Sequence, residues 1–138
     1  MTVGGRTAPF VVRLERGTIN RFIYSLAMLA PNPESLASPE GLDRSFWSGK
    51  LVYSFQGGVG IGHQQGSFST GRAAALHEAA LRRGHAVAYS TGNITGVHYN
   101  LVLAGETAMM VKGHFVVTYG RPDYTLGVGG AGGALQQY

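Results

Sequence analysis

The sequence predicts an α/β fold in which an antiparallel pair of strands leads into a parallel βαβαβ sheet. Apolar runs of strand length alternate with helix-forming segments over the later part of the chain, through short connections. Two of these runs end directly in glycine-rich loops, and the 22 glycines among 138 residues come to about 16%, where about 7% is usual. Strands that alternate with helices in this way form parallel sheets.

The amino-terminal part predicts the antiparallel pair. Apolar runs at 10–14 and 22–29 are joined through Gly17 and Asn20, which are residues that favour turns. We therefore expect two strands at one edge of the sheet, and a helix over the second run is the alternative. A proline-rich stretch at 31–39 then predicts a loop.

Five segments make up the predicted parallel unit. Its first helix is expected to end at Gly84, because a glycine in the left-handed conformation commonly closes a helix. The aromatic side chains of its first strand are expected in the core. Parallel strands end at one edge of their sheet, and ligands bind there, so the loops after the first and third strands should meet. In chain order the segments are a strand at 51–55, a helix at 72–83, a strand at 85–90 closing in a turn at 91–93, a helix at 101–119 and a strand at 124–128.

Charge and composition exclude several function classes. The net charge is +4 and the pI is about 9.7, yet the cations are scattered, with Arg82 and Arg83 the only adjacent pair. A nucleic-acid partner needs clustered cations, so none is expected. No apolar run reaches the 18 or so residues that span a bilayer, and residues 1–8 do not form a signal peptide, so no membrane partner is expected.

The sequence predicts neither a metal nor a cofactor. The absence of cysteine excludes disulfides, thiolate metal sites and a cysteine nucleophile. The histidines lack the spacing of metal ligands, and most are expected on helix faces or in surface loops. They are His63, His77, His85, His98 and His114.

The loop after the last predicted strand has the spacing of a nucleophile elbow, G-x-S-x-G between a strand and a helix. The central residue of such a turn is strained so that its side chain stands above the sheet. The residues two before and two after must be very small, and Gly129 and Gly133 stand there. The central residue is Ala131, which has no hydroxyl and cannot attack a carbonyl.

The loop at 56–60 supplies the other half of such a site. An oxyanion hole needs the N–H of the residue after the nucleophile and one from an earlier loop. We expect these donors to be Gly132 together with Gly58 or Val59. Residues flanking these donors are expected to line a substrate pocket, although His63 is also typical of a surface loop; they are Gly57, Gly60, His63 and Gly130.

A resemblance to a known family extends over most of the chain, from about Arg13 to Tyr138. Five segments carry it: GTINRFIYSLAMLAP, WSGKLVYSFQGGVG, ALRRGHAVAYSTGN, HYNLVLAGETAMMVKGHFVVTYGRP and YTLGVGGAGGALQQY. Together they resemble a bacterial family of secreted α/β-hydrolase-like proteins that are related to tannases and feruloyl esterases. The family has G-G-S-G-G-A followed by glutamines at the last segment, so the match departs at Ala131. In that family a cysteine often stands at the position that Val59 occupies in this chain.

The resemblance implies a serine-type carboxylic ester hydrolase that acts on a small-molecule ester, and a secreted or periplasmic location. It implies the first half of an α/β-hydrolase fold, in one incomplete domain over 1–138. The triad order is serine, acid, histidine, so acid and histidine would follow the elbow and lie outside this chain. With Ala131 at the nucleophile position, through natural degeneration or deliberate exchange, we expect the chain alone to be inactive. Gln136 and Gln137 are expected to face solvent or the missing part.

Three alternatives remain open. The chain is also compatible with a non-catalytic binding or interaction module that keeps the pocket without the chemistry. The segment 127–132 fits G-x-G-x-x-G after a strand, the fingerprint of dinucleotide binding, although such a motif usually opens its domain. A plain glycine turn is the third. The unpaired edge of a truncated sheet further predicts self-association, or pairing with a missing carboxyl-terminal part.

Overall fold

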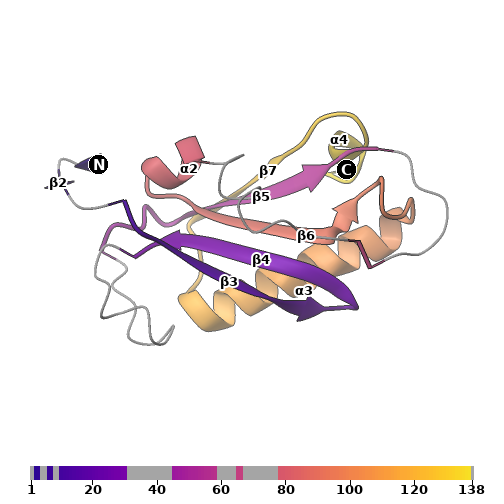
Figure 1. Cartoon of the computed structure of the whole chain (residues 1–138), viewed down its shortest axis with the longest axis horizontal. Coiled ribbons are helices and arrows are strands. Elements are labelled where there is room, and N and C mark those ends of the chain that lie inside the picture. Colours follow the sequence, from indigo (N-terminus) through magenta and orange to yellow (C-terminus); the bar gives the residue numbers. More distant parts are fainter. Residues whose placement is uncertain are drawn as a thin grey trace.

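The computed structural model describes residues 2–3, 6–7, 10–30, 45–58, 65–66 and 78–137 (Figure 1). A five-stranded sheet in the order β3-β4-β6-β5-β7 forms its centre, and β1 and β2 pair separately. The strands are β1 (Thr2–Val3), β2 (Arg6–Thr7), β3 (Val12–Ile19), β4 (Phe22–Leu29), β5 (Lys50–Gln56), β6 (Ala86–Ile94) and β7 (Tyr124–Val128). The helices are α2 (Glu78–Arg82), α3 (Leu101–Tyr119) and α4 (Gly132–Leu135).

The predicted α/β class is confirmed, and the sheet is mixed. β5 pairs in parallel with both β6 and β7, while β3 pairs antiparallel with β4, and β4 pairs antiparallel with β6. The helix at 101–119 and the strand at 124–128 have the predicted bounds. Along the chain the strands of the parallel unit come in the predicted order, and within the sheet β5 lies between β6 and β7.

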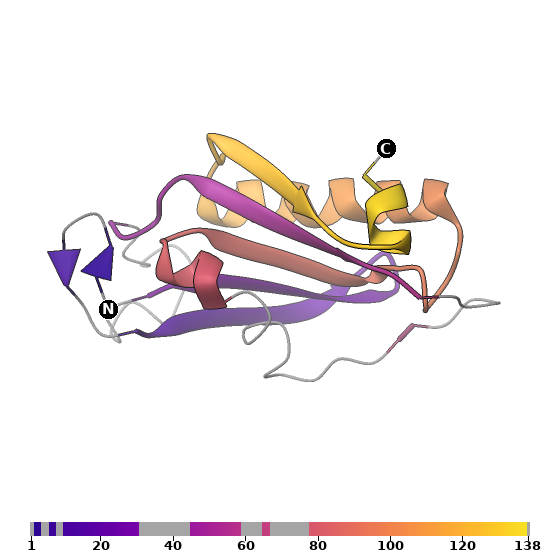
Figure 2. The same ribbon diagram turned by 90° about the horizontal axis from the view of Figure 1, so that it is seen from above.

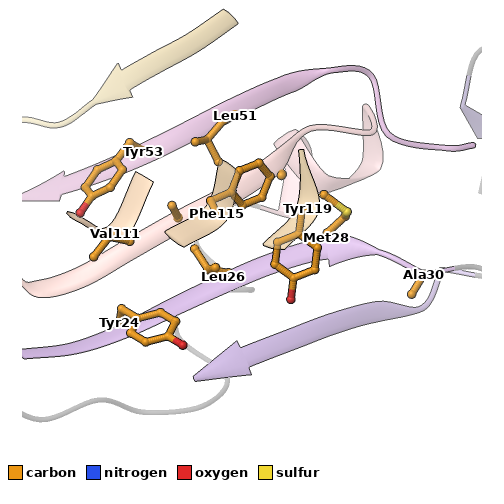
Figure 3. Packing of buried hydrophobic residues seen from close by; sticks show 11 residues of the cluster. Tyr24, Leu26, Met28, Ala30, Leu51, Tyr53, Val111, Phe115 and Tyr119 are labelled. Carbon is orange, nitrogen blue, oxygen red and sulfur yellow. The ribbon is translucent and has the colours of Figure 1, made fainter. Parts of the chain in front are cut away.

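Helices lie on both faces of the sheet, α3 on one and α2 on the other (Figure 2). The larger core lies under α3, where Phe115 is fully buried against side chains of β4 and β5 (Figure 3). Tyr53 belongs to this core and Phe55 packs against it, as predicted, and Trp47 before β5 packs there too. The smaller core on the other face consists of Ala27, Val52, Leu81 and Val87.

The first hairpin differs from the prediction in where its turn falls. The first strand runs from Val12 to Ile19 rather than over 10–14, so Gly17 lies inside β3. The turn is Asn20 and Arg21, whose φ angles of 55° and 71° are those of a tight two-residue hairpin. A Cβ atom at Gly17 would lie 2.7 Å from the Tyr24 ring, so glycine at this position leaves room for that ring against β3.

The strand β6 also differs, since it continues to Ile94 and does not turn at 91–93. These residues are buried and have partners inside the fold. Thr91 Oγ1 accepts a hydrogen bond from the Ile23 amide at 3.0 Å. Gly92 lies under the Phe22 ring, where a Cβ atom would come within 2.5 Å of a ring carbon. Tertiary contacts thus keep a turn-like sequence extended.

The ends of the helices are closed by residues that favour such positions. Asn100 caps α3, and its side chain accepts a hydrogen bond from the Leu103 amide at 3.1 Å. Gly120 ends the same helix with a φ of 114°. Gly84 follows α2 with a φ of 84°, as expected of a residue that closes a helix. The earlier part of that predicted helix, 72–77, lies outside the described residues.

The helix α3 carries apolar residues on its exposed side as well as on its buried side. By length and composition this helix is long and apolar enough to cross a membrane, and it is the one such helix in the described part of the chain. Helices in the core of a soluble protein can be equally long and apolar. Here one side packs on the sheet through Ala104, Thr107, Val111, Phe115 and Tyr119. The other side is exposed, with 88% exposure at Val117 and 77% at Met109.

A carboxylate at the edge of the larger core makes the stability of the fold depend on pH. Glu15 accepts hydrogen bonds from the hydroxyls of Tyr24 at 2.9 Å and Tyr119 at 2.7 Å, and it contacts His114 Nε2 at 2.7 Å. Burial by itself raises the pKa of Glu15. The hydrogen bonds from Tyr119, His114 and Tyr24 together outweigh burial, so the pKa of this carboxyl is lowered.

We expect Glu15→Gln to lower the free energy of unfolding by about 1 to 2 kcal/mol at pH 7. Because the pKa of Glu15 is lower in the folded chain, its stabilisation is complete above the unfolded pKa near 4.5 and is lost as pH falls through the folded pKa. Urea unfolding of both chains from pH 7 to pH 3 measures this, with Glu106→Gln on the exposed side of α3 as the control. A difference between wild type and Glu15→Gln that persists unchanged at pH 3 contradicts the prediction.

Candidate functional site

The turn between β7 and α4 holds Ala131 in a strained backbone conformation. Its φ is 53° and its ψ is −124°, a region that residues other than glycine rarely occupy at a cost of order 1–3 kcal/mol. Among the described residues, the other non-glycine residues with positive φ are Asn20 and Arg21 of the hairpin turn. Ala131 is exposed, so this strain presents its side chain at the tip of the strand.

Close packing accounts for two of the glycines in this turn. A Cβ atom on Gly129 or on Gly133 would lie 2.6 Å from the carbonyl oxygen of Phe55, which is backbone and cannot move aside. Gly130 has nothing within 4 Å of such an atom. The positions two before and two after Ala131 therefore admit only glycine where the turn packs on β5.

The turn after β7 lies against the corner after β5, as Figure 1 shows for α4 and the end of β5. A Cβ atom on Gly57 would lie 3.1 Å from Ala131 Cβ, from the Gly130 oxygen and from the Gly132 nitrogen. Gly58 follows with a φ of 121°. The structure thus brings together five of the predicted site residues. The other three, Val59, Gly60 and His63, lie outside the described residues.

Thr95 joins the two corners, and sequence reasoning missed it. Its hydroxyl donates to the Gly58 oxygen at 2.7 Å and its amide donates to the Gln56 oxygen at 3.1 Å. A Cβ atom on Gly132 would overlap Thr95 Oγ1, so the buried threonine also packs against the turn after β7. The strand before Thr95 was expected to end at 90, which placed this residue in an unassigned loop.

Gln136 is half-buried and its side-chain amide turns into the fold, whereas it was expected to face solvent or the missing part of the chain. Its side-chain amide donates hydrogen bonds to the main-chain oxygens of Gln56 and Asn93, each at 3.1 Å. Its oxygen lies 3.4 Å from the Asn93 side-chain nitrogen. The reason is that α4 is short and turns this side chain back toward the ends of β5 and β6. Gln137 is exposed and donates to the Gly133 oxygen at 3.2 Å.

An open groove of about 420 Å³ lies between α3 and α4, over β5 and β7. Its lining includes Tyr53, Phe55, Met109, Lys112 and Gln136. Neither Gly57 nor Gly130, the two predicted pocket residues that the structure describes, lines this groove. It is therefore a different feature from the corner at Gly57 and Ala131.

A serine–histidine hydrogen bond occurs at the opposite edge of the sheet. Ser48 Oγ lies 2.7 Å from His85 Nδ1, and both residues precede the strands β5 and β6. Burial, and then the charges of Lys50 and Arg83, lower the pKa of His85. The lowered pKa favours the neutral form of His85, and Ser48 must be controlled for in any test of serine reactivity.

No group of three or more His, Asp or Glu side chains in the described ranges is placed to hold a metal ion. The buried His98 has structural partners instead. Its Nε2 lies 2.8 Å from the Gly92 oxygen, and its Nδ1 accepts from the Asn100 amide at 3.1 Å. It therefore ties the end of β6 to the start of α3.

Comparison with known proteins places the chain in a family. Neither the curated proteins nor the solved structures include a match. The model of a tannase-like family of unknown function matches residues 1–138. The expected relation to tannases is thus confirmed, and it spans the whole of the sequence. The chain belongs to this tannase-like family.

Proposed function

We propose that the two glycine corners form the acyl-binding part of a serine ester hydrolase site of the α/β-hydrolase type. Residue 131 stands at the nucleophile position. The backbone N–H groups of Gly132 and of Gly58 or Val59 are the oxyanion donors. The observation that carries the proposal is the positive φ of Ala131 at a strand-to-helix turn that contacts Gly57.

The chemistry needs a hydroxyl at residue 131 and two N–H groups beside it. In ester hydrolysis the hydroxyl oxygen attacks the carbonyl carbon, and the N–H groups stabilise the negative charge that develops on the carbonyl oxygen. Gly132 is the first residue of α4, and N–H groups in the first turn of a helix have no acceptor within it. Its nitrogen lies beside Gly57, which supports a shared oxyanion site.

The methyl group of Ala131 makes the chain as it stands inactive. A carboxylic ester of a small molecule is the substrate class that the tannase-like family supports. We expect no hydrolysis of p-nitrophenyl acetate by the wild-type chain above the rate in buffer. A non-catalytic binding module is the second candidate, and the retained turn around a missing hydroxyl favours it.

The test of the catalytic site is Ala131→Ser treated with a fluorophosphonate. The serine oxygen forms a bond to phosphorus, the P–F bond breaks, fluoride leaves and the hydroxyl proton passes to the buffer. Because one oxyanion donor contributes about 10²-fold or more, we expect residue 131 to react about 10²-fold faster than an exposed serine such as Ser48. Peptide mass spectrometry locates the label and gives both rates in one sample.

Two controls make this test specific. The wild-type chain has no hydroxyl at 131 and must give no label there. Ala131→Ser combined with Ser48→Ala removes the serine of the Ser48–His85 pair and must label residue 131 at an unchanged rate. Reaction at residue 131 no faster than at Ser48 overturns the hydrolase proposal. Binding of phenyl acetate by the wild-type chain, read from the Gly57 and Gly132 amide resonances, then decides whether the binding module stands.

A further inference from the structure

We propose that Gln136 is a positioning residue that sets the spacing between the two glycine corners. The effect of Gln136 on a reaction at residue 131 rests on the proposed function, whereas the hydrogen bonds that Gln136 makes do not depend on it. Gln136 follows α4 and therefore moves with the turn that holds Ala131. One of its acceptors, the carbonyl of Gln56, directly precedes Gly57. A single side chain thus connects the turn after β7 to the corner after β5.

The acceptors of Gln136 lie where the sheet becomes irregular. The ladder between β5 and β6 shifts register between Ser54 and Gln56, and Gln56 then pairs with Ile94. The Gln56 oxygen already accepts from the Thr95 amide at 3.1 Å, and at such a shift a carbonyl has room for a second donor from outside the ladder. The Gln136 side chain supplies two N–H donors, to the oxygens of Gln56 and Asn93. An ionised glutamate or a methionine of similar length supplies none.

Asn93 makes a firm anchor for this arrangement. Its side chain is fully buried, accepts from the Tyr53 hydroxyl at 2.5 Å and donates to the Ala104 oxygen of α3 at 2.8 Å. Burial raises the pKa of Tyr53, so its hydroxyl stays protonated and remains a donor. Gln136 therefore fastens α4 to a residue that β5 and α3 already hold.

A loss of this connection lets α4 tilt relative to the corner at Gly57. The turn would remain, because the packing of Gly129 and Gly133 on Phe55 does not involve Gln136. The side chain at 131 would then be displaced from the oxyanion donors that the proposed function assigns. A displacement near 1 Å lowers the rate of a reaction at that side chain by about 10²-fold.

The experiment compares Ala131→Ser with Ala131→Ser/Gln136→Met in labelling by the fluorophosphonate. We expect the maximal rate constant at residue 131 to fall roughly 10- to 100-fold in the double variant, at an unchanged half-saturating concentration of the probe. In Ala131→Ser/Gln136→Glu at pH 8 the rate constant should fall by a similar factor. This variant replaces the methionine variant if the latter does not fold. Leu81→Ala, in the core on the other face of the sheet, controls for a general loss of stability and should leave the rate constant unchanged.

A second measurement separates this inference from the proposed function. In the wild-type background with Ala131 intact, Gln136→Met should shift the amide resonances of Gly57 and Gly132 and speed their hydrogen exchange, and Leu81→Ala should not. Equal labelling of the single and double variants overturns the positioning role and leaves the hydrolase proposal standing. If residue 131 of Ala131→Ser is not labelled, the hydrolase proposal fails. If the amide resonances of Gly57 and Gly132 also do not shift in Gln136→Met, the positioning role is overturned as well.

Discussion

Replacing Gly133 with alanine is expected to lower the free energy of unfolding by about 3 kcal/mol. A Cβ atom at this buried position would lie 2.6 Å from the Phe55 oxygen and 2.8 Å from the Phe55 carbonyl carbon. Both atoms are backbone of β5, so relief requires α4 to move away from the sheet. Alanine is favoured over glycine within a helix by about 1 kcal/mol, and the steric cost must exceed that gain.

Gly130→Ala is the matched control, because the same added methyl group meets nothing within 4 Å. Urea unfolding of the two variants should differ by at least about 2 kcal/mol, and Gly130→Ala should stay within about 0.5 kcal/mol of wild type. Equal stability of the two variants would contradict the packing of the turn on β5. The loss in Gly133→Ala alone would explain why glycine stands two residues after Ala131.

The elements that sequence reasoning located best are those with local signals at both ends. The helix α3 begins after Asn100 and ends at Gly120, and each of these residues makes the cap that its chemistry favours. The strand β7 lies between Pro122 and the glycine turn, which leaves little freedom in its bounds. The turn around Ala131 was also predictable from a local signal, because its glycines lie next to Ala131 in the sequence.

What the sequence could not reveal depends on contacts between distant segments. The run at 91–93 is typical of a turn, and it continues β6 because Thr91 and Asn93 find partners on β4, β5 and α3. Gln136 is typical of an exposed helix, and its acceptors become visible only once β5 and β6 end beside α4. The conformation and partners of these residues are set by tertiary contacts and cannot be inferred from residue type alone.

Phe115→Ala is expected to lower the free energy of unfolding by about 4 kcal/mol. The ring is fully buried between α3 and the sheet, with the Trp47 ring at 5.7 Å and the Tyr119 ring at 5.3 Å between centroids. Truncation removes this contact area and leaves a cavity in the larger core. Val117→Ala, two residues along α3 and 88% exposed, is the control and should change stability by no more than about 0.5 kcal/mol.

This prediction also bears on the candidate site, because α3 supplies the Ala104 oxygen that holds Asn93. If α3 shifts into the cavity left by Phe115→Ala, the hydrogen bonds from Tyr53 to Asn93 and from Asn93 to Gln136 should weaken together. Hydrogen exchange at Asn93 and Gly132 should then rise in Phe115→Ala beyond the rise set by its lower global stability, and remain unchanged in Val117→Ala. Exchange at these amides that rises only as much as global stability falls would show that the corner is held independently of α3.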